Sequence, residues 1–501
     1  MTRTKTISKE GPEERKQKLP TSSPPPATPA RPSISSTVSG TALWTYSSCF
    51  MHEGHTPPTS HQVDLKKVMH AELGDQTWQL PLDRAANVEE ILHGGNCCRG
   101  RASQVTRISY SVPENVISNG FMKAAWPKCD LDPGRSSVPE VRMLNVCGDK
   151  FGTSQHHYFF PANHSRGIPT SNDIVLPTEM ELKKGVAEFH RNLLKYSTPL
   201  PEYRSLCIHV GKLTGTSLVS SPSPLVLFTA ILHAMLGWLA ICQEALQHRD
   251  VSVGNVLRLS NPVEMPSFKF KSDIADLMGT LSLSETLPFT VTDQITRLKS
   301  SLAELKVNTR CSGFIIDVDM AIDWKTYSDA NHNGTRSGTP EFMSARLRRS
   351  LRLPRAYVQS TVDDLASFYY VGQWAAVFNP SHQSNLLEEL RNDIAGSVTS
   401  RESASSRTTN LNPKLFSDRQ DYGLFLLCCK PTLAAWKNSI TSLDDWFQEA
   451  MQELIARSDG KIDPDTHRSL FLSFAYHGVA DFAQILERNG ASLASYDKLV
   501  S

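Results

Sequence analysis

The feature that most constrains this chain is the octapeptide His-Arg-Asp-Val-Ser-Val-Gly-Asn at residues 248–255, which follows the apolar stretch 225–240. Asp250 and Asn255 stand five positions apart in it. In a tight loop, this spacing lets one carboxylate reach a substrate hydroxyl while the amide reaches a metal ion. A surface loop with an Arg-Asp pair and a capping Asn explains the same residues, so the octapeptide alone leaves both interpretations open.

Three further motifs follow in order along the chain. Residues 313–321 have the pattern of an apolar strand that ends in the acid Asp317. Residues 337–344 read Ser-Gly-Thr-Pro-Glu-Phe-Met-Ser, and residues 363–370 read Asp-Asp-Leu-Ala-Ser-Phe-Tyr-Tyr. Four motifs in a fixed order are much harder to obtain by chance than one.

These motifs resemble the catalytic loop, the metal-binding Asp, the end of the activation segment and the helix after it in protein kinases. Their spelling resembles the fungal-type protein kinase domain family, over roughly residues 90–450. The resemblance implies an α+β, two-lobed protein-kinase-like fold, with a small β-rich lobe and a large helical lobe. It also implies that the chain binds ATP and Mg²⁺, that Asp250 is the catalytic base, and that Asn255 and Asp317 are Mg²⁺ ligands.

The small lobe should supply the nucleotide-phosphate contacts. Residues 99–105 resemble the family's glycine-rich loop and bring Gly100 and Val105 to the cofactor, although a loop without a ligand explains them as well. Residues 120–126 alternate as an inner strand should and resemble the strand that carries the phosphate-binding lysine, here Lys123; an exposed strand lysine is the alternative. The ion-pair partner of Lys123 would then be Glu140 on the following helix. Residues 203–211 resemble the strand that enters the interlobe hinge.

The domain boundaries follow from these assignments and from composition. Residues 1–40 are rich in Pro, Ser, Thr and basic residues and are expected to be disordered. The expected order is then an N-terminal extension at 41–90, the small lobe at 91–212, the large lobe at 213–455 and a C-terminal helical extension at 456–501. The last of these is expected to be an appended helical hairpin.

An insertion interrupts the large lobe. Asn255 and Asp317 are 62 positions apart (317 minus 255), against about a dozen in a compact kinase. The insertion is placed at 260–311, where apolar residues recur at Ile295, Leu298, Leu302 and Leu305 behind the plausible caps Thr292 and Asp293. An amphipathic helix that packs on the kinase body is the default interpretation, and a docking helix for a partner is the alternative. As an accessory element, the insertion should be replaceable by a short linker.

Composition limits the partners and the compartment. The formal net charge of +1 gives no reason to expect nucleic acid or a membrane surface as a partner. The resemblance of the Gly-Thr-Pro-Glu segment around Thr339 to the peptide-binding region of protein kinases implies a protein substrate. The ten cysteines form no C-x-x-C pair and no apolar leader follows the early basic residues, which favours an intracellular protein, cytoplasmic or nuclear. The apolar stretch 225–240 is shorter than the roughly 20 residues of a membrane span and is expected to be a buried helix.

Departures from the kinase pattern keep two rival functions open. Ser252 replaces a catalytic-loop Lys, which is normal for the resembled family, but Arg346 stands where a Glu usually pairs with an Arg of the large lobe. An Arg at that position would repel the usual partner unless the partner has changed too. With the degraded glycine-rich loop, this favours a pseudokinase scaffold as one rival to an active Ser/Thr protein kinase. A small-molecule phosphotransferase is the other, because such enzymes share the Asp-x-x-x-x-Asn loop.

Overall fold

The computed structural model describes the two lobes and leaves out several connecting segments. The described residues are 62–64, 71–73, 76–78, 85–94, 103–111, 117–125, 146, 148, 150–161, 207–271, 287, 289–324, 337–351, 357–396, 415–416, 422–457 and 462–500. The expected tail at 1–40 lies outside these residues.

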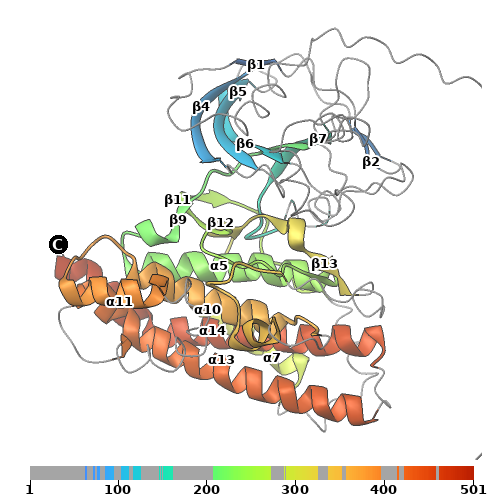
Figure 1. The fold of residues 1–501 in the computed structure, drawn as a ribbon, viewed down its shortest axis with the longest axis vertical. Helices are drawn as coiled ribbons and strands as arrows, with labels where there is room; N and C mark the ends of the chain where they lie inside the picture. Colours follow the sequence, from blue (N-terminus) through green and yellow to red (C-terminus); the bar gives the residue numbers. More distant parts are fainter. Residues whose placement is uncertain are drawn as a thin grey trace, which may run out of the picture. The chain divides into compact units, whose positions relative to one another are not determined.

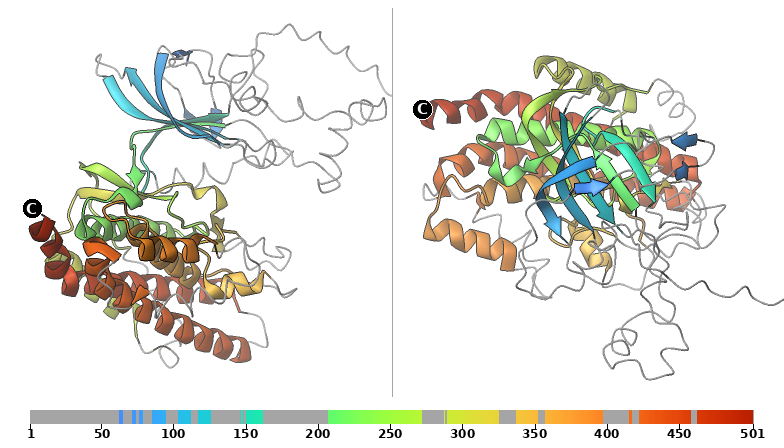
Figure 2. Two further views of the ribbon diagram at one scale, coloured as in Figure 1. Left: turned by 60° about the vertical axis from the view of Figure 1, so that its left-hand side comes forward. Right: turned by 90° about the horizontal axis from the view of Figure 1, so that it is seen from above.

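The small lobe is built on one antiparallel sheet (Figure 1). Its strands in spatial order are β1 (Gln62–Asp64), β4 (Ala85–Gly94), β5 (Gln104–Ser111), β6 (Ile117–Ala125), β8 (Cys207–Gly211) and β7 (His156–Pro161). The strands twist across the sheet (Figure 2), as right-handed strands do. A separate hairpin joins β2 (Ala71–Leu73) to β3 (Gln76–Trp78). Strand pairing thus begins at Gln62, within the stretch expected to be an extension.

The large lobe is organised around helix α5 (Pro224–Gln243), which precedes the catalytic loop. The Ser223 hydroxyl caps its N-terminus by accepting from the Val226 amide at 3.5 Å, and Pro224 occupies its first turn. Among the described helices, α5 alone is long and apolar enough to cross a membrane. It is 20 residues long, so the length argument against a span was wrong. Most of its side chains are buried inside the protein, however, and the expectation of a buried core helix is confirmed.

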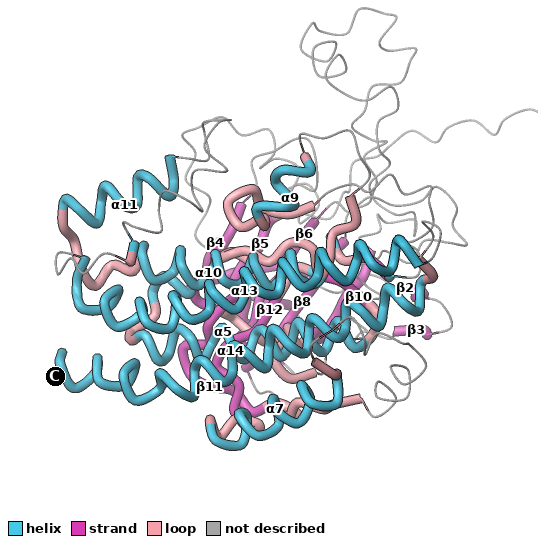
Figure 3. Tube along the Cα trace, turned by 90° about the horizontal axis from the view of Figure 1, so that it is seen from below, coloured by secondary structure: helices cyan, strands magenta, loops and turns pink. Residues whose placement is uncertain are grey.

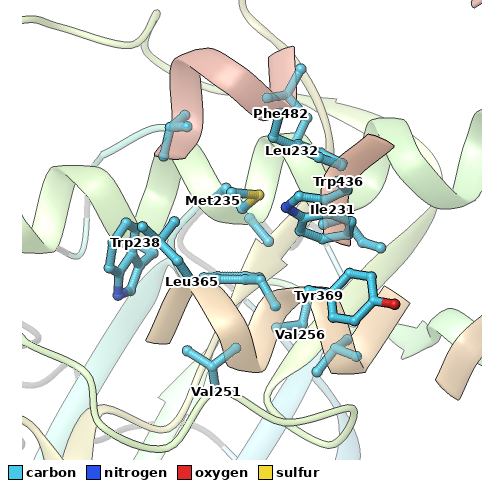
Figure 4. Close-up of a cluster of buried hydrophobic side chains, with 14 of the residues drawn as sticks. Ile231, Leu232, Met235, Trp238, Val251, Val256, Leu365, Tyr369, Trp436 and Phe482 are labelled. Carbon is cyan, nitrogen blue, oxygen red and sulfur yellow. The ribbon is translucent and has the colours of Figure 1, made fainter. Parts of the chain in front are cut away.

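Long helices pack around α5 and share its core. They are α10 (Thr361–Val377), α13 (Gly423–Arg457) and α14 (Pro464–Val500), with the shorter α11 (Asn385–Gly396) beside α10. Figure 3 shows them side by side from below. In Figure 4, Trp436 of α13 lies among Ile231 of α5, Tyr369 of α10 and Phe482 of α14, and its ring centroid is 4.1 Å from that of Phe482.

Helix α14 corrects the expectation for the C-terminal stretch. It is one continuous helix of 37 residues, so an appended helical hairpin was wrong. Phe471, Phe474, Val479 and Phe482 are almost fully buried against the other helices of the large lobe. The helix is therefore part of the large-lobe core.

Two small antiparallel sheets position the catalytic loop. Strands β11 (Val256–Glu264) and β12 (Arg310–Ile315) pair antiparallel, and β9 (Thr216–Ser217) adds to the free edge of β11. Strands β10 (Leu246–Gln247) and β13 (Ile322–Asp323) form the second pair. Residues 248–255 run from β10 into β11. The pairing of these strands therefore fixes both ends of the loop relative to the segment that contains Asp317.

The insertion connects the end of β11 to the start of β12. Its two ends are joined by a hydrogen bond from Met265 N to Thr309 O at 2.8 Å. It contains the expected amphipathic helix, α7 (Val291–Glu304). The cap is Thr290 rather than Thr292: its hydroxyl accepts from the Asp293 amide at 3.1 Å. Leu298 and Leu302 are buried in the core, and α7 packs on α14. The default interpretation is confirmed, since its own chain covers the apolar face of this helix.

Residues 150–155 bind directly to α5 and β12. Gly152 has a φ of +72°, and a Cβ at Gly237 of α5 would lie 1.9 Å from the Gly152 carbonyl oxygen. The absence of side chains at both positions is what permits this approach. Ser154 N donates to Ile315 O at 3.2 Å, and Ile315 N donates to Gly152 O at 2.9 Å. The segment leading into β7 is thereby fixed beside the strand that precedes Asp317.

Candidate active site

His248 joins the catalytic loop to the strand end beside it. Its Nδ1 accepts from the Asp250 amide at 3.3 Å, so Nε2 carries the proton and donates to Ile316 O at 2.9 Å. Burial lowers the pKa of His248 and keeps the ring neutral. A second proton would have to displace the Asp250 amide from Nδ1. The imidazole therefore acts as a fixed spacer between the two chain segments.

The carboxylate of Asp250 is held on both of its oxygens. Thr339 donates from its backbone amide and from its hydroxyl to Oδ1, each at 2.9 Å. Asn255 Nδ2 donates to the Asp250 carbonyl at 2.8 Å and approaches Oδ2 at 3.3 Å. The half-buried Asp250 is thus oriented by Thr339, which is 89 positions downstream, and by Asn255, which is 5 positions downstream.

Asn255 has a defined amide orientation. Its nitrogen faces two oxygen atoms of Asp250, so its own Oδ1 must point the other way and is available as a ligand. Its backbone carbonyl accepts from the Ile316 amide at 2.9 Å. This bond brings Asn255 next to the residue that precedes Asp317.

Asp317 and Lys123 meet although they are 194 positions apart. Lys123 Nζ donates to Asp317 Oδ1 at 2.7 Å, and Lys123 is 9% exposed on β6. Asp317 precedes a single 3₁₀ turn, η5 (Val318–Met320), and has the left-handed backbone angles φ 62° and ψ 65°. Non-glycine residues adopt this conformation only where the surroundings impose it, often at functional sites. The alternative for Lys123, an exposed strand lysine, is wrong.

The remaining small-lobe candidates are only partly described. Val105 of β5 lies directly opposite Lys123 of β6, so both side chains are on the same face of the sheet. His209 of β8 lies opposite Lys123 on the other side. The glycine-rich turn falls between β4 and β5, but Gly100 lies outside the described residues, as does Glu140.

Asp364, near the start of α10, is hydrogen-bonded to the backbone of the catalytic loop. Its Oδ2 accepts from the Arg249 amide at 3.3 Å and from Trp238 Nε1 at 3.0 Å. Burial raises the pKa of the Asp364 carboxyl to about 7. Gln359 adds a second support, because its Nε2 donates to the Arg249 carbonyl at 3.1 Å. The sequence placed Asp364 in a motif but gave no sign of these bonds, because they join segments more than a hundred residues apart.

Arg346 is paired with acids. Its Nη2 lies 3.6 Å from Asp363 Oδ2, and its Nε lies 3.5 Å from Asp444 Oδ1 of α13. The central carbon of its guanidinium, Cζ, is 4.7 Å from the ring centre of Phe447. Asp363 also accepts from the hydroxyls of Ser344 and Tyr357. Acids therefore face Arg346, and the expected repulsion does not occur. Short helix α9 (Ala345–Ser350) is anchored by this reversed pair.

The residues present fit a magnesium ion that takes only some of its ligands from the protein and the rest from phosphates and water. Within the described part of the chain, no group of three or more His, Cys, Asp or Glu side chains is arranged to hold a metal. Magnesium commonly takes one or two protein oxygens and completes its shell with phosphates and water. The Asp317 carboxylate and the free Oδ1 of Asn255, on segments joined by a hydrogen bond, match that requirement.

Comparisons with known proteins agree with this geometry. The chain matches the family described as fungal protein kinase over residues 102–376, more than half of its 501 residues. Lys123, Asp250, Asn255 and Asp317 all fall inside this range. A solved structure of vaccinia related kinase 3 is similar at 10% identity, with 85% of this chain and 98% of that chain covered and a TM-score of 0.36. No curated protein matches the chain. The family match, together with the two lobes and their motifs, shows that this chain belongs to the fungal protein kinase family.

Proposed function

We propose that the chain is an ATP-dependent protein kinase that transfers the γ-phosphate of ATP to a Ser or Thr hydroxyl of a protein. The observation that carries the proposal is the double hydrogen bond from Thr339 to the Asp250 carboxylate. Thr339 belongs to the Gly-Thr-Pro-Glu segment, which shapes peptide binding in protein kinases. The residue that orients the proposed base thus belongs to the segment that would contact the substrate.

Asp250 is the proposed general base for the substrate hydroxyl. Thr339 occupies its Oδ1 and Asn255 approaches its Oδ2, so the carboxylate cannot rotate freely. An oriented base avoids the entropy of finding the reactive geometry. Its remaining acceptor capacity would take the hydroxyl proton, because each carboxylate oxygen has more than one lone pair.

Lys123 and Asp317 are the proposed phosphate and metal ligands. Their ion pair puts a cation from the small lobe beside an anion from the large lobe. When bound, magnesium would neutralise the charge that develops on the phosphates during transfer. Asp317 and Asn255 would hold it, while Lys123 would bind the phosphate oxygens.

The rival functions differ in their support. Arg346 no longer favours a scaffold, since Asp363 and Asp444 satisfy it. A small-molecule phosphotransferase has no need of a Thr from a peptide-binding segment at its base. Both rivals are outcomes of the following experiment.

The experiment compares Asp250→Asn with the parent protein and with Asp445→Asn, an exposed acid on α13. We expect Asp250→Asn to bind Mg-ATP almost as the parent does, because the proposed role of Asp250 is to contact the substrate hydroxyl rather than the nucleotide or the metal. Radiolabel transfer to mixed Ser/Thr, Tyr and small-molecule acceptors should fall about 10²- to 10⁴-fold, the usual worth of a positioned base. Asp445→Asn should transfer normally. A parent protein that binds nucleotide but transfers no more than Asp250→Asn would be a scaffold.

A further inference from the structure

Arg348 of α9 is a buried cation without a counter-ion. It is 9% exposed, its Nε has no hydrogen-bond partner, and no carboxylate in the described part of the chain forms an ion pair with it. Its guanidinium lies over the ring of Tyr370 on α10, with Cζ 5.6 Å from the ring centre.

The surroundings make this arrangement unusual. A buried charge is costly unless it is paired, and a cation over an aromatic ring recovers only part of that cost. Arg346, two residues earlier in the same helix, shows how this protein pairs a guanidinium that belongs to its own structure: two acids face it. Arg348 lacks such acids. The Arg348 guanidinium can therefore gain a favourable ion pair with an anionic group of a bound molecule.

Arg348 also lies close to the proposed substrate site. Phe342 N donates to Thr339 O at 2.9 Å, so the chain turns tightly after the residue that holds Asp250. Phe342 then contacts Trp374 of α10, with ring centres 5.6 Å apart. Trp374 is one helical turn from Tyr370, the ring beneath Arg348, and is therefore on the same face of α10. Arg348 is thus linked to the segment that holds Asp250 through the packed rings of Phe342, Trp374 and Tyr370.

We propose that Arg348 is a substrate subsite for an acidic side chain, a carboxylate or a phosphorylated residue, that flanks the acceptor hydroxyl in the peptide. The Tyr370 ring covers one part of the guanidinium, and the planar N–H edge is suited to two parallel hydrogen bonds with such a group. This inference rests on the proposed kinase function and adds the class of its substrate.

The test is a positional peptide scan with the full chain and Mg-ATP. Ser- and Thr-centred peptides carry Asp, phosphoserine, Ala or Lys at each flanking position. We expect the parent to prefer acidic residues at one or two positions on one side of the acceptor. Arg348→Gln should lower kcat/KM for the preferred acidic peptides about 10- to 100-fold, the range of a charge-assisted hydrogen bond, and change that for Ala peptides less than threefold. Arg348→Glu should reverse the preference toward Lys.

Arg349→Gln is the matched control, because Arg349 is the exposed neighbour on the same helix. Equal loss of acidic preference in this variant would mean a diffuse positive field and would overturn the subsite. Transfer without any acidic preference in the parent overturns the subsite alone and leaves the kinase function intact.

If no peptide is phosphorylated, the kinase proposal fails and the subsite is tested by binding. Fluorescence anisotropy of a labelled Asp-rich peptide should then show weaker binding to Arg348→Gln than to the parent or to Arg349→Gln. Equal binding by all three overturns the subsite. Scanning the parent keeps the inference testable even if the Arg348 variants do not fold.

Discussion

At the scale of single residues, the reversed pair between Arg346 and Asp444 should be exchangeable. Breaking a buried pair leaves an uncompensated charge, and Arg346→Glu would also face Asp363. We expect Arg346→Glu to lower the free energy of unfolding by about 3 kcal/mol. Asp444→Arg, which brings two cations together, should also destabilise. The double variant should recover about 1 kcal/mol or more relative to additivity, measured by urea unfolding.

The control for this exchange is Arg349→Glu, an equal charge change on the exposed side of α9. It should shift the free energy of unfolding by no more than about 0.5 kcal/mol. Additive effects of Arg346→Glu and Asp444→Arg would mean that the two side chains do not interact energetically.

Asp364 gives a pH dependence of stability. Burial holds its pKa at about 7 in the folded protein, against an ordinary value of 3.8. Between about pH 4 and 7 the unfolded chain therefore loses a proton that the folded protein keeps, and stability falls as the pH rises. Asp364→Asn has no proton to lose. The loss of stability from pH 4.5 to 7, measured by urea unfolding, should be smaller in Asp364→Asn than in the parent. An equal loss in both would mean that Asp364 is ionised in the folded protein.

Sequence motifs predicted which residues are present near the site but not how they are held. Asp250, Asn255 and Asp317 could be chosen because kinase spellings surround them. The support given by Thr339, His248 and Gln359 comes from hydrogen bonds between segments tens of residues apart. Nothing in local sequence encodes such bonds. The pairing of Arg346 was missed for the same reason, since Asp444 is 98 positions away (444 minus 346).

At the scale of elements, the structure reverses the expectation that the insertion can be removed. Leu298 of α7 is fully buried, Arg297 pairs with Asp481 of α14 at 2.7 Å, and the Ser301 hydroxyl donates to Glu487 at 2.9 Å. Leu298→Ala should lower the free energy of unfolding by about 2–5 kcal/mol, because it leaves a cavity between α7 and α14. Ser300→Ala, on the exposed face, should change it by about 0.5 kcal/mol or less. Chemical denaturation measures both.

Replacing residues 266–308 by a Gly/Ser linker extends the same test. It would uncover buried side chains of α14, so we expect poor soluble expression. A soluble, cooperatively folding deletion protein would show instead that the insertion is accessory.

The elements differ in how well sequence predicted them. Helix α7 and strand β6 have clear periodicity and were predicted correctly. The cap of α7 was placed two residues late, because Thr290 and Thr292 are both plausible caps and only the backbone geometry decides. Helix α14 was predicted as a hairpin because the spacing of Gly478 and Gly490 faintly resembles half of an ankyrin repeat. Gly478 instead makes room for Leu365 of α10, where a Cβ would lie 2.4 Å from the Leu365 side chain.

At the scale of the whole molecule, nucleotide should stabilise both lobes together. Lys123 and Asp317 belong to different lobes, so a ligand that binds both makes separation of the lobes more costly. Mg-ATP at a hundred times its dissociation constant should add about 2.7 kcal/mol to the free energy of unfolding. The melting temperature should therefore rise, and Lys123→Ala combined with Asp317→Ala should abolish the rise. No shift of the parent protein at millimolar nucleotide would contradict ATP binding.

The position of α14 in the chain affects how the protein can be made. The catalytic loop ends at Asn255, whereas α14 begins at Pro464, 209 residues later (464 minus 255). A ribosome adds about 5–20 residues per second, so α5 and the catalytic loop are synthesised roughly 10–40 s before the helix that covers them. The part of the α5 surface that α14 covers has no native partner during that interval. Chaperone binding to the nascent chain should be strongest then, and a premature stop codon upstream of Pro464 should yield an aggregating protein with every catalytic motif present.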